Sequence, residues 1–218
     1  MRLDMLHPSW LIFASGFRQD ALREGTRRLF DVLASLALIL VSWPLMLLTA
    51  LAIKLEDGWK APVLYRQTRV GLMGRNFNIF KIRSMREDAE VDGQARWATT
   101  NDERVTRVGR FVRKARLDEL PQIFNVFVGD MSVVGPRPER PEFVGELCGK
   151  IPYYRERHYV RPGITGWAQL CYAYGASEED AVEKLQYDLY YVKNHGLVFD
   201  LVILLQTVEV IIFGKGAR

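Results

Sequence analysis

The pattern of hydrophobic and polar positions changes sharply within the first quarter of this chain. Residues Val32 to Ile53 form a stretch of about 22 positions without a charge, which as a straight helix measures about 33 Å, enough to cross a membrane. Basic residues stand on both sides of it, among them Arg28 and Lys54, and the chain beyond has the mixed charge of a protein that folds in water. Both flanks therefore favour the same side of a membrane.

Pro44 lies near the middle of this apolar stretch. Proline lacks an N–H and its ring clashes with the carbonyl four residues earlier, so we expect a kinked helix in which Ser42 satisfies a freed carbonyl. The stretch is longer than the roughly 7–15 residues of a signal-peptide core, and we expect it to stay on the protein. We favour a re-entrant helix that enters one leaflet, bends and returns; a bitopic span with a tolerated proline is the alternative.

Short alternating patterns follow. Pro62–Gln67 and Phe77–Arg83 alternate apolar and polar residues and are separated by Gly71 and Gly74, which predicts two short strands or a hairpin. Residues 86–103 are polar and offer few core positions, so we expect a loop there.

Residues 104–127 predict two helices joined near Leu117. Pro121 is tolerated only in a first helical turn, so the second helix should begin near Asp118. The run Gly135-Pro-Arg-Pro further along must be extended or turned, because residues that precede proline avoid the α region.

The C-terminal quarter predicts two more helices. The first begins at the N-cap Ser177 and closes at Gly196. Its apolar stripe consists of Val182, Leu185, Leu189 and Val192. The second covers Leu197–Phe213, which is very apolar but interrupted by polar residues. A helix on the membrane surface and a buried core helix both fit this second segment.

Together these elements predict an α+β fold that is mostly helical, in which amphipathic surface helices and a proline-kinked re-entrant membrane helix surround a small cytosolic body. We divide the chain into an N-terminal amphipathic or linker segment at 1–25, the membrane helix at 26–54, and a cytosolic domain with membrane-surface helices at 55–218.

Composition narrows the chemistry. The chain has 30 basic and 26 acidic residues, a net charge of +4, and its basic residues cluster at 66–86 and 104–116. It lacks the sequence motifs of P-loops, dinucleotide-binding folds, zinc proteases and serine hydrolases. Cys148 and Cys171 are spaced for neither a metal nor a redox pair, so we expect both to be reduced. The modest charge and the membrane stretch argue against a nucleic-acid partner.

The sequence RLDELPQ sets two acids, Asp118 and Glu119, behind a run of arginines. At a helix start these acids would cap free N–H groups and complement the helix dipole. A carboxylate placed there beside arginines also keeps a low pKa and stays ionised, as a nucleophile or magnesium ligand must, and the two roles are compatible. The arginines recur at Arg104, Arg107, Arg110, Arg113 and Arg116. They suit bidentate binding of phosphate oxygens, while a solvated helix face is the plain alternative.

Two loops each present a cation. Arg137 stands between two prolines, which lower the entropy cost of holding it against a phosphate. Arg161 opens the sequence Arg-Pro-Gly-Ile-Thr-Gly-Trp, whose backbone and aromatic residue would fit a nucleotide or a sugar. Ordinary turns would explain both sequences as well.

Seven motifs, in order along the chain, together resemble the bacterial sugar transferases, the monotopic polyprenyl-phosphate phosphoglycosyl transferases. They are Arg27-Arg28-Leu-Phe-Asp31, Phe80-Lys81-Ile-Arg83-Ser84-Met85, Leu117-Asp118-Glu119-Leu120-Pro-Gln, Asn125 with Gly129-Asp130-Met131-Ser132, Gly135-Pro-Arg-Pro138, Arg161-Pro-Gly-Ile-Thr-Gly-Trp-Ala-Gln169 and Asp188-Leu-Tyr-Tyr-Val192. The resemblance runs from about residue 25 to the end of the chain.

This resemblance implies a catalytic domain at the cytoplasmic face of the bacterial inner membrane. The enzyme would move a sugar-1-phosphate from a nucleoside-diphosphate sugar, a UDP-sugar, to undecaprenyl phosphate and release UMP, as the first membrane step of exopolysaccharide or glycoconjugate assembly. Its partners would be these substrates and membrane lipids, and an oligomer stays open. The rival hypotheses are a non-catalytic membrane-attached binding module with a basic surface and a transferase that moves a sugar without its phosphate.

The resemblance also implies residue roles. Asp118 would attack the β-phosphate to form a covalent aspartyl phospho-sugar, with Glu119 beside it as the second catalytic residue. Whether Glu119 is the base that acts on the incoming polyprenyl phosphate is left open by the resemblance. Mg²⁺, held by Asp118, would neutralise the diphosphate. The implied substrate- and phosphate-binding residues are Lys81, Arg83, Arg113, Arg137, Arg161, Gln169 and Asp188. Such phosphoryl transfer needs positioned charge more than unusual side chains.

Two features depart from the family pattern. Trp43 separates Ser42 from Pro44, whereas the family often has serine directly before the kinking proline. Many relatives also carry a large N-terminal membrane region, and residues 1–25 resemble the end of one. We therefore expect the chain to be a short form or a fragment of a longer protein.

Overall fold

The fold is described from a computed structural model that places residues 21–86, 89, 102–172 and 177–213. The predicted segment 1–25 lies mostly outside these residues, as does most of the predicted loop 86–103. The placed chain is mostly helical with four short strands, which confirms the predicted balance of secondary structure.

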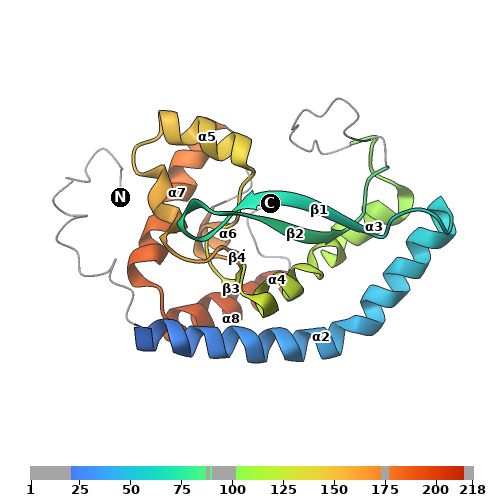
Figure 1. The fold of residues 1–218 in the computed structure, drawn as a ribbon, viewed down its shortest axis with the longest axis horizontal. Helices are drawn as coiled ribbons and strands as arrows, with labels where there is room; N and C mark the ends of the chain where they lie inside the picture. The colour runs from blue at the N-terminus through green and yellow to red at the C-terminus, as the bar shows by residue number, and fades with distance from the viewer. Residues whose placement is uncertain (1–20, 87–88, 90–101, 173–176, 214–218) are drawn as a thin grey trace.

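The apolar stretch forms most of one long helix, α2 (Ala21–Asp57). Within the described ranges, α2 is the one helix whose length and composition suffice to cross a membrane. Figure 1 shows α2 running beneath α4 and α8 and then turning toward α3. Pro44 lies inside it, but the expectation for Ser42 needs correction, because among the placed residues the buried Ser42 Oγ has no hydrogen-bond partner.

The predicted hairpin is confirmed. Strands β1 (Leu64–Val70) and β2 (Asn76–Ile82) pair antiparallel, with Leu64 opposite Ile82 and Val70 opposite Asn76. The 3₁₀ turn η3 (Leu72–Gly74) joins them. Gly74 has a φ of 76°, in the left-handed region that glycine adopts without strain.

The segment around RLDELPQ differs from prediction in one respect. Helix α3 (Arg107–Lys114) is followed by the 3₁₀ turn η4 (Leu117–Glu119), and α4 (Gln122–Val128) begins four residues later than Asp118. Arg116 takes a φ of 57°, which ends α3 and starts the separate turn. Pro121 stands at the N-cap of α4, so Asp118 belongs to η4 and does not cap the helix.

A second, parallel pair of strands was not anticipated. Strand β3 (Ser132–Val134) pairs with β4 (Gly163–Thr165), and the connection between them contains α5 (Pro141–Lys150) and η5 (Tyr154–Tyr159). A Cβ on Gly163 would lie 2.0 Å from the backbone nitrogen of Gly135, so this pairing requires glycine. The loop that carries Arg137 leaves the end of β3 directly after this close contact.

The last helices are α6 (Trp167–Cys171), α7 (Glu178–Asn194) and α8 (Leu197–Phe213). Ser177 and Asp180 cap each other's backbone N–H groups at the start of α7, which confirms the predicted N-cap. Helix α8 is buried on one side only, because Ile203 is fully buried while Leu205 is 72% exposed, and its predicted place at the membrane surface stays a prediction. The main core contains Ile79, Val126, Met131, Val133, Val134, Val160, Tyr191, Val192 and Ile203.

A buried polar network joins α2 to this core. Arg27 donates to Asp200 Oδ2 at 2.9 Å and to the Tyr191 hydroxyl at 2.7 Å. Asp31 accepts hydrogen bonds from the Ser132 hydroxyl and the Val133 N–H, both at 2.9 Å. Strand β3 is thereby fixed to the N-terminal half of α2.

Candidate active site

A cavity of about 560 Å³ lies between the hairpin, α3, η4, α6, α7 and the loop after β3. Of the residues singled out in the sequence, it brings together Lys81, Arg83, Arg113, Asp118, Arg137, Gln169 and Asp188. Glu119 stands directly beside this group through its bond to Arg137. Segments that are more than 100 residues apart in the chain therefore supply one site.

Asn125 places the acidic turn η4 against the hairpin. Its amide is fully buried, accepts from the Phe80 N–H at 3.1 Å and donates to the Asn78 carbonyl at 2.8 Å. These two bonds satisfy backbone groups of β2, as a neighbouring strand would, and they hold α4 beside β2. The turn η4, immediately before α4, is thus held next to Lys81 on the same strand.

Glu119 is bound to the loop after β3. Arg137 donates to Glu119 Oε1 at 2.7 Å, and Arg116 approaches the same oxygen at 4.0 Å. Burial alone would raise the pKa of Glu119, but Arg137, Lys81 and Arg116 outweigh it and bring this pKa to about 2. Glu119 is therefore ionised and already engaged.

Asp118 differs from its neighbour, and here the sequence expectation is corrected. Burial, and then the charge of Glu119, raise the pKa of Asp118, although Lys81 and Arg113 act in the opposite direction. The low pKa expected from a helix cap is absent because η4 is not the start of α4. In the placed chain Asp118 Oδ1 is buried without a hydrogen-bond partner, so this oxygen is available to a ligand.

The cavity is strongly cationic. Its arginines are Arg69, Arg83, Arg86, Arg104, Arg113, Arg116, Arg137, Arg140 and Arg157. Burial, followed by Arg137 and Arg69, lowers the pKa of Lys81 to about 8. So much positive charge around few acids suits an anion with several oxygens, such as a diphosphate.

The arginine repeat divides into two groups. Arg104, Arg113 and Arg116 line the cavity, whereas Arg107 and Arg110 are exposed on α3 and do not. Arg113 is oriented by its Nε, which donates to Ser84 Oγ at 2.9 Å. The solvated-face interpretation therefore describes Arg107 and Arg110, while phosphate binding stays a prediction for the three arginines that line the cavity.

Asp188 lines the cavity but is bound to a residue that the sequence did not single out. Its carboxylate pairs with Arg157 at 2.7 Å, and Arg157 also donates to the Arg137 carbonyl at 2.9 Å and the Tyr154 hydroxyl at 2.7 Å. Burial raises the pKa of Asp188 to about 6 although Arg157 opposes the change. No motif pointed to Arg157, because its role depends on a contact with a loop 20 residues away.

Gln169 and Arg161 lie in different surroundings. Gln169 lines the cavity, and among the described residues its buried Oε1 has no hydrogen-bond partner. Arg161 is not one of the residues that line the cavity. It donates to the Gly129 carbonyl at 3.1 Å and forms an ion pair with Glu24. The structure therefore does not bring Arg161 together with Asp118.

Mg²⁺ fits this site only if phosphate oxygens of a bound substrate supply part of its coordination shell. The described residues contain no group of three or more His, Cys, Asp or Glu side chains arranged to hold a metal. Mg²⁺ commonly uses one or two carboxylates and completes its shell with water and phosphate oxygens. The buried, unpartnered Oδ1 of Asp118 meets that smaller requirement.

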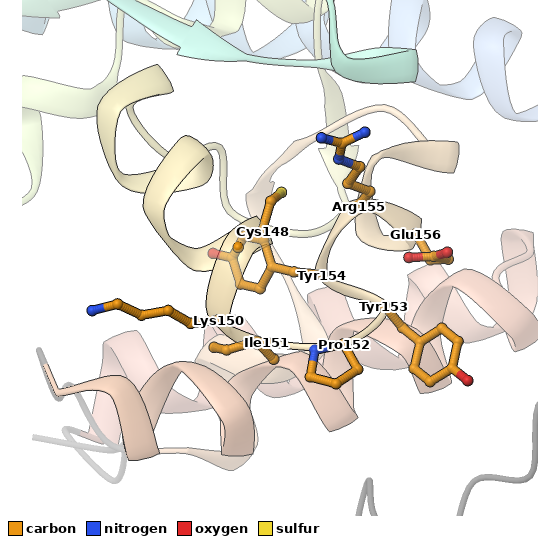
Figure 2. Close-up of a pocket in the computed structure, with 9 residues that line it drawn as sticks. Cys148, Lys150, Ile151, Pro152, Tyr153, Tyr154, Arg155 and Glu156 are labelled. Atoms are coloured by element: carbon orange, nitrogen blue, oxygen red, sulfur yellow. The ribbon is translucent and has the colours of Figure 1, made fainter.

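A smaller cavity of about 290 Å³ lies at the end of α5 and the start of η5. It is lined by residues 148–156 and shares none of them with the larger cavity. Figure 2 shows Lys150, Tyr153 and Arg155 extending in different directions, and Lys150 pairs with Glu146 at 2.8 Å. The larger cavity is the better candidate because its charged groups converge.

Comparison with known proteins agrees with this choice. A family model described as bacterial sugar transferase matches residues 22–214. The chain is 48% identical over its whole length to a UDP-N-acetylgalactosamine-undecaprenyl-phosphate N-acetylgalactosaminephosphotransferase of Aeromonas hydrophila, of which it covers 50%. Over 87% of the chain it is 44% identical to a UDP-glucose:undecaprenyl-phosphate glucose-1-phosphate transferase of Escherichia coli, covering 41% of that protein.

A shorter relative matches nearly end to end. The exopolysaccharide production protein PSS of Rhizobium leguminosarum is 40% identical over 87% of the chain and 97% of its own length. The chain thus spans about half, or less, of the two longer relatives and almost all of this one.

Proposed function

The chain belongs to the bacterial sugar transferase family, and we propose that it transfers a sugar-1-phosphate from a UDP-sugar to undecaprenyl phosphate and releases UMP. The observation that carries this proposal is a carboxylate oxygen of Asp118 that lies at a cavity lined by arginines and has no hydrogen-bond partner among the described residues. A diphosphate would be neutralised there by cations that the fold already holds in place. The relatives' names agree with both substrates.

Asp118 is the nucleophile in this proposal. One carboxylate oxygen attacks the β-phosphorus of the UDP-sugar, the bond to the bridging oxygen breaks, and UMP leaves with that oxygen. An oxygen of undecaprenyl phosphate then attacks the same phosphorus and frees the carboxylate of Asp118. Burial suits Asp118 to this role, because a carboxylate with little solvation must shed less water before it attacks.

Glu119 and the cavity cations serve the same step without exchanging protons. With a pKa of about 2, Glu119 is a poor base at neutral pH, and its bond to Arg137 instead holds that guanidinium at the cavity. Arg113, Arg137 and Lys81 would bind the phosphate oxygens. Mg²⁺, held by Asp118 and the diphosphate, would supply further neutralising charge.

The membrane arrangement completes the proposal. We place the chain at the cytoplasmic face of the inner membrane, with α2 as a re-entrant helix kinked at Pro44 and α8 at the membrane surface. The support is the change in direction of α2 in Figure 1 and the exposed apolar residues on α8, such as Val198 and Leu205. An enzyme so placed reaches a soluble nucleotide sugar and a lipid-linked phosphate from one side.

Replacement of the nucleophile tests this function. Asp118→Asn and Asp118→Ala should lower UMP release by at least about a thousandfold, because neither side chain can form the acyl phosphate. Membrane attachment and circular dichroism should match wild type. The wild-type protein incubated with UDP-sugar alone should gain the mass of a sugar phosphate on the peptide that contains Asp118, and both variants should not.

Glu146→Gln is the matched control, since Glu146 is an exposed acid that does not line the cavity and pairs with Lys150, which does not line it either. It should turn over normally. Full turnover by the Asp118 variants would show that another group is the nucleophile, and UDP in place of UMP as product would identify a transferase that moves the sugar without its phosphate.

A further inference from the structure

Two acids at the end of the long helix α2 bind the elements that carry the cavity cations. Asp57 accepts from Arg83 at 2.5 Å, at the end of strand β2. Glu56 accepts from two backbone N–H groups of α3, with Oε1 at 2.9 Å from the Arg107 nitrogen and Oε2 at 3.0 Å from the Val108 nitrogen. Helix α3 carries Arg113 in its last turn.

These two bonds complete the N-terminus of α3. A helix leaves its first N–H groups without intrahelical partners. Here Glu56 takes the first two, and the Thr106 hydroxyl takes the Gly109 N–H at 2.9 Å. The Thr106 carbonyl accepts the first intrahelical bond, from the Arg110 N–H at 3.0 Å. The negative carboxylate also stands at the positive end of the helix dipole. Glu56 therefore fixes both the position and the direction of α3 from outside the helix.

The other side of α3 rests on Ser84, the residue that orients Arg113. The Thr106 N–H donates to the Ser84 carbonyl at 3.1 Å, and a Cβ on Gly109 would lie 2.0 Å from that oxygen. Arg113 Nε then reaches the Ser84 hydroxyl. Helix α3 is thus held at two points: its backbone packs against the backbone of Ser84, and Glu56 binds its N-terminus. The direction of Arg113 depends on both contacts.

The acidic turn η4 is held separately. Its Glu119 is bound to Arg137, and the Asn125 amide binds the following helix to β2. A displacement of the start of α3 would therefore move Arg113 more than it moves Asp118. This separation makes the contribution of Glu56 measurable on its own.

We propose that Glu56 is a positioning residue for the transfer reaction: by capping α3 it holds the Arg113 guanidinium where the phosphates of the nucleotide sugar bind. The inference rests on the function proposed above, since it assigns a partner to a cation of that site. It also assigns a role to the end of α2, because Glu56 lies in its last turn.

A double-mutant cycle tests this role. Glu56→Ala should raise KM for the UDP-sugar about 3- to 30-fold, the range expected for loss of a helix cap, with kcat changed less. Glu56→Gln, which keeps one acceptor oxygen, should fall between wild type and Glu56→Ala. In an Arg113→Ala background, Glu56→Ala should have almost no further effect on KM, because the residue it positions is gone. Glu146→Ala, the exposed control acid on α5, should leave KM unchanged in both backgrounds.

A second measurement does not depend on turnover. Amide hydrogen exchange should become faster for residues 107–110 in Glu56→Ala and stay as in wild type for the segment 122–128. Wild-type KM for Glu56→Ala, or an equal fold-change with and without Arg113, would overturn the positioning role. If wild type itself shows no turnover, the proposed function fails, while the exchange result still decides whether Glu56 holds α3.

Discussion

Asp118 and Glu119 are adjacent in sequence, yet the structure gives them opposite properties. Glu119 points to Arg137 and its pKa falls to about 2, whereas Asp118 has a raised pKa and a buried oxygen without a partner among the described residues. A 3₁₀ turn separates adjacent side chains by about 120°, which lets one acid bind the scaffold and the other face the cavity. Sequence spacing could identify the pair but could not divide the roles, because that division depends on Arg137.

Lys81 gives the site a pH dependence. Burial lowers the pKa of Lys81 to about 8, so the ammonium form is present below this pH and is lost above it. Since the proposed phosphate binding needs the charged form, kcat/KM for the UDP-sugar should fall as the pH rises from 7.5 to 9. The measurement is a pH profile of initial rates at low UDP-sugar concentration.

Two variants assign this profile to Lys81. Lys81→Arg keeps the charge throughout this range, so its kcat/KM should stay flat where wild type declines. Lys81→Met should be weak at every pH and lose the same decline. A wild-type decline that persists in Lys81→Met would mean that another group titrates.

At the scale of elements, local patterns predicted well and distant pairings did not. The hairpin and α7 were foreseen because alternation and an N-cap are local features, as was the apolar helix α2. The parallel pair β3–β4 was missed because each strand has only three residues and its partner lies about 30 positions away. The start of α4 was predicted too early because Arg116 adopts a left-handed conformation that propensity does not reveal.

The same limit applies to the site. Motifs identified Asp118, Lys81 and Arg137 of the cavity, but they did not reveal Arg157 or Glu56, which bond to backbone groups. A hydrogen bond to a carbonyl or N–H places no demand on the residue type of its partner, so no pattern records it. Arg157 in turn connects η5 and α7 to the loop that carries Arg137.

This connection predicts that stability and activity can be separated. Asp188→Asn should lower the free energy of unfolding by about 3–5 kcal/mol, because it leaves the buried Arg157 charge unpaired. Thermal unfolding in detergent would measure this change. The double variant Arg157→Met with Asp188→Leu should recover most of the stability, since an apolar pair can replace a buried ion pair.

Activity of that double variant should nevertheless stay low. The Arg137 carbonyl would still lack its donor, so the loop would hold the Arg137 guanidinium less firmly against Glu119. Recovery of both stability and turnover would show that Arg157 contributes only to stability.

At the scale of the whole molecule, both ends of the long apolar helix α2 bind one folded body. Near its start, Arg27 and Asp31 are bonded to α8, α7 and β3. At its end Glu56 is bonded to α3, and Asp57 is bonded to Arg83, the residue that follows β2. A bitopic span would place these two groups on opposite faces of a hydrocarbon layer about 30 Å thick. One water-exposed body cannot bind both across that layer, because its polar groups would have to lie within the lipid.

The contacts support the proposed re-entrant arrangement, in which α2 enters and leaves on one side of the membrane, and topology mapping tests this directly. Tags fused to the two termini should both be digested by protease in inside-out membrane vesicles and both be protected in intact spheroplasts. Pro44→Ala should restore an N–H and favour a straighter helix, which would pull the two bound ends apart and lower turnover. Protection of the two tags on opposite faces would exclude the re-entrant arrangement, and the bonds of Glu56 and Arg27 to a single body could then not both exist in the membrane.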